Sequence, residues 1–321
     1  MRVFFVVVLS VLAALTGAFF YFSDPDIPRG TLEAKYATPP SQFLRLADGA
    51  RVHVRDRGPR NAPVLVLLHG NQLSLFTWEP WASRLDDAFR VVTMDLPGSG
   101  LTGAVPSGDY TQQGMVEFVK AVADQLGLGQ FIIGGHSLGG GTAVRFAETY
   151  PDRVTQLILV DAVGMPSKPP APRSWVSRVL RAPVLNQVLL HVTPRPMVAQ
   201  MLNGVIVRRS AITDRIIDQT WDFARMEGAR QVMLTRYGLP RDTYIKDHIG
   251  EVKAPTLILW GENDRDIPVA DGYGFAKAIP GSKLILYLGT GHFPEDEMPD
   301  QSAADVRAFL LAGKGAVASS Q

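Results

Sequence analysis

A serine flanked by glycines lies between a strand-like and a helix-like stretch of this chain. The sequence Gly-His-Ser-Leu-Gly at residues 135–139 follows an apolar run at 130–134 and precedes a helix-like run at 140–147. Small residues on both sides of Ser137 allow a sharp bend that presents its hydroxyl at the top of a sheet. Because this pattern is frequent in a chain with 30 glycines, a nucleophilic Ser137 also requires a base and an orienting acid elsewhere.

Two later segments supply a base and an acid of the required kinds. The apolar run at 256–260 is followed by Asp264, and the run at 283–288 leads into His292. His292 is predicted to take the proton of Ser137 and to return it to the leaving group. Asp264 is predicted to fix the imidazole tautomer and to stabilise the imidazolium.

Each of these residues follows a buried strand, and their chain order is typical of one family. Serine, aspartate and histidine in this order, each at the C-terminal end of a strand, is the arrangement of the α/β-hydrolases. A further apolar run at 62–68 ends in His69-Gly70-Asn71, the position of an oxyanion loop. From about residue 43 to residue 311 the chain resembles the capped serine hydrolases of this family, namely monoacylglycerol-lipase-like and bacterial lipase- or esterase-like members.

The resemblance implies a fold and the remaining parts of the site. The fold is α/β, with a mostly parallel central sheet, helices on both faces and a helical cap insertion. The backbone N–H groups of Asn71 and Leu138 would form the oxyanion hole, and His69 would brace the loop. Some members place the acid one strand earlier, which makes Asp161 the alternative to Asp264. The Trp-Gly-Glu-Asn-Asp context at 260–264 favours Asp264.

Several reactions are compatible with this resemblance, because the fold hosts many chemistries. The favoured one is hydrolysis of a carboxylic ester with an apolar acyl group, through an acyl-enzyme on Ser137. Carbon–carbon bond hydrolysis of ring-fission products is an alternative, although those members typically have a glycine-rich oxyanion loop that residues 71–74 lack. Cleavage of an amide, as by an amidase or iminopeptidase, is a second alternative. The last alternative is that the chain is a non-catalytic binding module.

The composition excludes several other function classes. The net charge of +1 over 321 residues gives no field that favours nucleic acid. There is no cysteine, so disulfides, thiolate catalysis and cysteine-based metal sites are excluded. No H-E-x-x-H motif or histidine cluster indicates a metal. The sequence predicts no cofactor, no metal and no nucleic-acid partner, with a small-molecule ester as substrate, and it leaves the oligomeric state open.

The N-terminus differs from the rest of the chain. Residues 3–22 are uncharged and mostly apolar, and 20 helical residues span about 30 Å, the thickness of a bilayer core. Residues 1–22 are therefore predicted to form a transmembrane anchor, with a cleaved signal peptide as the alternative. The prediction places a single-pass protein in a membrane with its catalytic domain outside the cytoplasm, periplasmic or lumenal; secretion after cleavage is the alternative.

The remaining boundaries follow from proline content and strand–helix alternation. Residues 23–41, with four prolines, are predicted to be an extended tether. The hydrolase core comprises 42–163 and 249–313, the cap 164–248, and a flexible tail 314–321. Methionines in the cap suggest an adaptable apolar pocket. The candidate pocket residues are Met197, Met201, Met226 and Met233.

Overall fold

The centre of the molecule is one eight-stranded sheet. The structure, a computed structural model, describes residues 1–165, 182, 186, 190–240 and 244–318. The strand order is β1-β2-β4-β3-β5-β6-β7-β8. Only β1, β2 and β4 are joined by antiparallel pairs, and the other neighbours are parallel. The strands are β1 (Ser41–Arg45), β2 (Arg51–Arg57), β3 (Val64–Leu68), β4 (Arg90–Met94), β5 (Phe131–His136), β6 (Val154–Val160), β7 (Thr256–Gly261) and β8 (Lys283–Tyr287).

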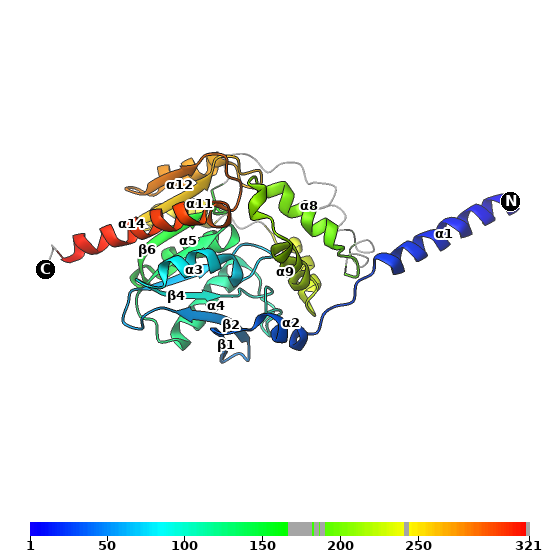
Figure 1. The fold of residues 1–321 in the computed structure, drawn as a ribbon, viewed down its shortest axis with the longest axis horizontal. Coiled ribbons are helices and arrows are strands. Elements are labelled where there is room, and N and C mark those ends of the chain that lie inside the picture. Colours follow the sequence, from blue (N-terminus) through cyan, green and yellow to red (C-terminus); the bar gives the residue numbers. More distant parts are fainter. Residues whose placement is uncertain (166–181, 183–185, 187–189, 241–243, 319–321) are drawn as a thin grey trace.

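The central strands are mostly apolar and lack a polar face, because both faces of the sheet are covered. In β6, Leu157 packs into the core on one face, and Ile158 packs into the core on the other. The helices α4 (Gln112–Gln125), α5 (Leu138–Thr149) and α12 (Val269–Ala278) cover the first face; α3 (Glu79–Leu85) and α14 (Pro299–Ala318) cover the second. Figure 1 shows this layered body, and the predicted α/β sheet is confirmed.

The insertion between β6 and β7 is helical where it is described. Its helices are α8 (Arg195–Val205), α9 (Asp214–Ala224), α10 (Ala229–Gly238) and α11 (Tyr244–His248). Figure 1 shows α8 and α9 on the side of the body from which the N-terminal helix projects. Val198 and Ile217 form a small core of this insertion together with Phe293 of the main body, so the predicted cap packs directly on the hydrolase core.

The predicted extended tether contains a packed helix instead. Helix α2 (Arg29–Tyr36) lies within residues 23–41. Leu32 on this helix is 1% exposed and packs in a small core with Phe223 of the cap. Tyr36 donates a 2.8 Å hydrogen bond to the Asp222 carboxylate. The apolar contact and this bond hold the segment on the cap, which four prolines alone did not predict. At the other end, α14 continues to Ala318, past the boundary predicted at 313.

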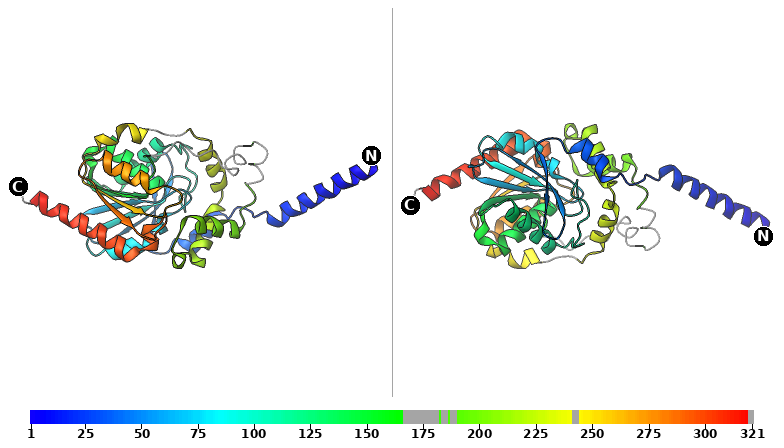
Figure 2. Two further views of the ribbon diagram at one scale, coloured as in Figure 1. Left: turned by 90° about the horizontal axis from the view of Figure 1, so that it is seen from above. Right: turned by 90° about the horizontal axis from the view of Figure 1, so that it is seen from below.

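The N-terminal segment forms the helix α1 (Arg2–Phe22). Figures 1 and 2 show it projecting away from the sheet and the helices that cover it. Among the residues that the structure describes, no helix combines the length and the apolar character needed to cross a membrane. The helical part of the prediction is therefore correct, and the transmembrane anchor over residues 1–22 is not supported.

Candidate active site

Ser137 occupies a strained turn between β5 and α5. Its backbone angles are φ +52° and ψ −115°, a region that costs energy for any residue with a side chain. The turn closes only because its neighbours lack side chains. A Cβ on Gly135 would lie 2.2 Å from the backbone of Gly139, and a Cβ on Gly139 would lie 2.1 Å from the carbonyl oxygen of Leu68. The glycines on both sides of Ser137 are therefore needed because the backbone turns too tightly for side chains, as the sequence predicted.

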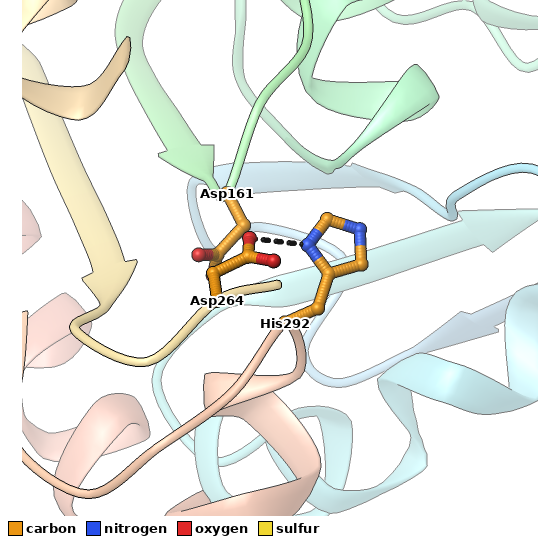
Figure 3. Close-up of side chains that lie close together, drawn as sticks. All are labelled: Asp161, Asp264 and His292. Atoms are coloured by element: carbon orange, nitrogen blue, oxygen red, sulfur yellow. Dashed lines mark hydrogen bonds and ion pairs between the residues drawn. The ribbon is translucent and has the colours of Figure 1, made fainter. Parts of the chain in front are cut away.

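His292 and Asp264 form a buried pair at the same edge of the sheet. The Nδ1 of His292 lies 2.6 Å from Oδ2 of Asp264, as Figure 3 shows. The other oxygen of Asp264 accepts hydrogen bonds from the backbone N–H of Asp266 (2.7 Å) and of Ile267 (3.0 Å). The carboxylate is thus held from both sides. Because Nδ1–H donates to Asp264, the Nε2 of His292 is left to accept a proton.

Asp161, the alternative acid, lies beside this pair and plays a different part. It is fully buried, and its Oδ1 accepts a 3.0 Å bond from the backbone N–H of Gly261. Burial and the neighbouring Asp264 carboxylate raise the pKa of Asp161 well above its usual range. Two adjacent buried carboxyl groups do not both ionise, and Asp264 has more hydrogen-bond donors. The proton of the pair therefore resides on Asp161.

The same three side chains are the candidate for a metal site. One donor atom each of Asp161, Asp264 and His292 lies within 4.8 Å of the others (Figure 3). The Asp264 oxygens are already engaged by His292 and by two backbone N–H groups. This arrangement satisfies the carboxylate with hydrogen bonds, so we interpret the cluster as a hydrogen-bonded histidine–carboxyl group.

A second buried pair lies beneath His292. His136, next to Ser137, donates from Nε2 to the carbonyl oxygen of His292 at 2.7 Å. Its Nδ1 lies 3.5 Å from Oε1 of Glu295. Burial lowers the pKa of His136 well below its ordinary value and raises the pKa of Glu295 well above its own. Both side chains are therefore neutral, and this pair links the serine turn to the histidine loop.

The oxyanion loop is braced by a buried histidine. His69 donates from Nδ1 to the carbonyl of Gly70 at 2.7 Å, and its Nε2 accepts from the backbone N–H of Leu96 at 3.0 Å. Burial lowers the pKa of His69 to about 4, so the ring is neutral. Asn71 follows this loop, and Leu138 begins α5. Both residues line the same cavity as Ser137.

This cavity has a volume of about 790 Å³, which is in the range of small-molecule sites. Met233 of α10 is among its lining residues. The other three predicted pocket methionines are placed elsewhere. Met197 and Met201 are 48% and 41% exposed on α8, and Met226 is fully buried in the core beside α2. These three methionines are not among the residues that line this cavity.

Residues 63–298 match the family model of the alpha/beta hydrolase fold, which is most of the chain. This protein belongs to the alpha/beta hydrolase fold family. A 2-hydroxy-6-oxononadienedioate/2-hydroxy-6-oxononatrienedioate hydrolase of Klebsiella pneumoniae subsp. pneumoniae is 28% identical over 291 residues, covering 84% of this chain and 95% of that protein.

Two solved structures extend the comparison. A membrane phospholipase A described as a bacterial virulence factor has a TM-score of 0.73 and 22% identity, covering 98% of this chain and 99% of that one. A thermophilic esterase from Thermogutta terrifontis has a TM-score of 0.70 and 25% identity, covering 85% and 98%. The similarity to the phospholipase is a similarity of fold.

Sequence reasoning missed two residues at the site of this alpha/beta hydrolase. Glu297 is buried, and its carboxylate accepts bonds from the backbone N–H of Gly291 at 2.9 Å and of Arg208 at 2.7 Å. It thereby joins the His292 loop to the cap. The acidic run directly after His292 was a visible signal for this residue. Arg236, which enters the cavity from the cap, had no such signal in its surroundings.

Proposed function

We propose that this alpha/beta hydrolase cleaves carboxylic esters through an acyl-enzyme on Ser137. The observation that carries the proposal is the strained turn at Ser137 together with the 2.6 Å pair of His292 and Asp264. A hydroxyl at such a turn beside a cavity, a base whose Nε2 is left to accept a proton, and a carboxylate that fixes the base are the three parts of a serine nucleophile. The esterase from Thermogutta terrifontis is a structural neighbour with the proposed activity.

The proposed acylation step uses these three side chains. The Oγ of Ser137 attacks the ester carbonyl carbon while Nε2 of His292 takes its proton. The resulting imidazolium is stabilised by the Asp264 carboxylate. The backbone N–H of Leu138 lies at the start of α5, where the helix dipole favours an anion. This N–H and that of Asn71 would bind the oxyanion of the tetrahedral intermediate. Its collapse expels the alcohol, which receives the proton from His292.

Deacylation repeats the same steps with water. His292 deprotonates a water molecule, which attacks the acyl carbon, and the second tetrahedral intermediate releases the carboxylic acid and regenerates Ser137. The cavity supports an acyl portion that is partly apolar, because Leu138, Val163 and Met233 line it. Tyrosine and charged side chains make up much of the remaining wall, so the pocket is more polar than the sequence predicted.

A panel of matched substrates tests this proposal. Purified protein should hydrolyse short p-nitrophenyl esters, and the Ser137→Ala variant should lose this activity by a factor on the order of 10⁴. Amides and aminopeptidase substrates of the same acyl length serve as the comparison. If anilides or peptides are cleaved with higher kcat/KM than every ester, the ester proposal is wrong, although the nucleophile assignment would stand.

Carbon–carbon bond hydrolysis is the second candidate, and the curated relative favours it. The compound in its name carries a 6-oxo group and two carboxylates and has no ester, so the bond to be hydrolysed adjoins a ketone. The same Ser137, His292 and oxyanion groups would serve that reaction. Turnover of a ring-fission dienone with kcat/KM above that of every ester would establish this candidate in place of the esterase.

We also propose that α1 attaches the enzyme to a lipid surface. Phe4, Phe5, Leu9 and Phe20 on this helix are 59–72% exposed, and exposed apolar surface of this kind marks interaction sites. Deleting residues 1–22 should abolish co-sedimentation with lipid vesicles. The same deletion should leave hydrolysis of a short soluble ester intact, because Ser137 and its partners lie in the main body. Equal vesicle binding by the full and truncated chains would exclude this role.

A further inference from the structure

Arg236 lies in the substrate cavity and contacts the oxyanion loop. It is carried by α10 of the cap, and its Nη1 donates a 3.0 Å hydrogen bond to the side-chain oxygen of Asn71. Its Nη2 donates to the backbone carbonyl of Pro97 at 2.7 Å. The guanidinium therefore sits beside a residue whose N–H is expected to bind the substrate's oxyanion, and it lines the same cavity as Ser137.

The charge of Arg236 has no carboxylate partner in the described part of the chain. The carbonyl groups that accept its two N–H···O bonds are neutral, its Nε has no partner, and the Met115 sulfur lies 3.9 Å from Nη2. The Tyr110 ring, with its centroid 6.0 Å from Cζ, is also uncharged. Other arginines of the described residues do have carboxylate partners, for example Arg90 with Asp56 at 2.8 Å and Arg55 with Glu79 at 2.7 Å. A cation in a partly buried position without a counter-charge is unfavourable.

Arg236 nevertheless stays charged at neutral pH. Burial lowers its pKa only to about 10, so the positive charge is a permanent feature of the cavity. The Nε is buried, whereas Nη1 meets the exposed Asn71 at the wall of the cavity. Nη1 carries two N–H groups, and the bond to Asn71 uses one of them. Nη1 therefore has a further donor for a ligand.

We propose that Arg236 binds a carboxylate of the substrate, so that the preferred substrates are carbonyl compounds that carry a second, anionic group. This inference rests on the proposed function, because it names the substrate class of the same site. The free donor and the uncompensated charge of Arg236 match a carboxylate oxygen, which forms strong charge-assisted hydrogen bonds with guanidinium groups. The apolar lining would hold the chain between the carboxylate and the reacting carbonyl.

The other charges of the cavity favour a monoanion over a phosphate dianion. Asp247 and Asp266 also line it, and Asp266 lies 3.7 Å from Nε2 of His292. These carboxylates would repel a second negative charge. Arg145, the other arginine of the wall, is engaged by Gln113 at 3.0 Å and lies over the Tyr244 ring. A single carboxylate at Arg236 is therefore the group that the cavity accommodates best.

Two esters of equal acyl length test the proposal. The p-nitrophenyl monoester of glutaric acid and p-nitrophenyl valerate differ mainly in a terminal carboxylate. We expect the full-length protein to favour the glutarate monoester in kcat/KM, and Arg236→Met to reduce the ratio of the two values by roughly 10- to 100-fold, the size of a charge-assisted hydrogen bond. Arg236→Lys should retain part of the ratio. Arg209→Met, an exposed cap cation outside the cavity, should leave it unchanged.

The ratio of kcat/KM for the two esters distinguishes a role of Arg236 in binding the substrate from a role in bracing the oxyanion loop. If Arg236 only braces Asn71, Arg236→Met slows both esters equally and the ratio stays constant, which overturns the proposal. Calorimetric binding of monomethyl glutarate, a monoanion, and of uncharged methyl valerate to Ser137→Ala supplies a readout that needs no turnover. Monomethyl glutarate should bind more tightly, and the added Arg236→Met change should remove the difference. Equal binding of the two compounds overturns the proposal; absence of ester turnover with tight binding of monomethyl glutarate instead overturns only the proposed esterase activity.

Discussion

Replacing Asp264 with asparagine should inactivate the enzyme through the tautomer of His292. One oxygen of Asp264 accepts bonds from the backbone N–H groups of Asp266 and Ile267. Those donors require an acceptor, so the asparagine would keep its carbonyl oxygen there. Its NH₂ group would then face Nδ1 of His292, at the position where Oδ2 now lies 2.6 Å away. The imidazole would carry its hydrogen on Nε2 and would be unable to accept the proton of Ser137.

The expected loss in kcat for Asp264→Asn is that of an enzyme without its general base. A wrong imidazole tautomer in a serine triad lowers kcat by a factor on the order of 10⁴, which corresponds to about 5.4 kcal/mol of activation free energy. Asp161→Asn is the matched control. The carboxyl group of Asp161 lies next to that of Asp264, and an asparagine amide at this position is neutral and offers an N–H in place of the carboxyl proton. We therefore expect Asp161→Asn to retain activity within about tenfold of the parent protein.

Asp264→Asn, Asp161→Asn and the parent protein are compared by steady-state kinetics on one soluble ester. Unfolding midpoints are measured for each variant. Asp264→Asn should keep its fold and lose kcat with little change in KM. A normal rate for Asp264→Asn together with an inactive Asp161→Asn would refute the assignment and transfer the role to Asp161. A comparable loss in both variants would refute the view that Asp161 acts as a neutral donor.

Two further predictions concern buried parts of the site. Because the pKa of Glu295 is raised in the folded state, its stabilising contribution is complete below about pH 4.3 and is lost as pH rises through the folded pKa. Glu295→Gln should therefore gain stability relative to the parent protein as pH rises, by up to about 1.4 kcal/mol per pH unit in urea unfolding; a difference independent of pH would show that Glu295 is ionised. Gly139→Ala places a Cβ 2.1 Å from the Leu68 carbonyl oxygen and should destabilise the fold by more than about 3 kcal/mol. Gly129→Ala, with no atom within 4 Å of the added carbon, should lie within about 0.5 kcal/mol of the parent, and equal effects of the two substitutions would contradict the account of the turn.

The parts of the site that the sequence predicted depend on local signals. Apolar runs without alternation predicted the central strands because both faces of the sheet are buried. The glycines around Ser137 predicted a turn because their Cβ positions are occupied by neighbouring backbone. His292 follows a strand directly. Asp264 precedes two backbone N–H donors that its own loop supplies.

The parts that were missed depend on contacts between distant segments. The neutral state of Asp161 arises from its proximity to Asp264, which follows a different strand. Met226 was a candidate for the pocket, yet it packs with Leu32 of the segment that was predicted to be an extended tether. Arg236 reaches the oxyanion loop only because α10 folds over the body. Composition and residue spacing do not predict which distant segments contact one another, so these contacts were found only in the tertiary structure.

Covalent labelling tests the central claim most directly. A fluorophosphonate reacts with an activated serine and leaves a stable adduct that mass spectrometry locates on the chain. We predict one adduct on Ser137 of the native protein, and none in Ser137→Ala, which should unfold at the same temperature. An unlabelled native protein, an adduct on another serine, or a well-folded Ser137→Ala that keeps more than about a tenth of the ester turnover would contradict the account.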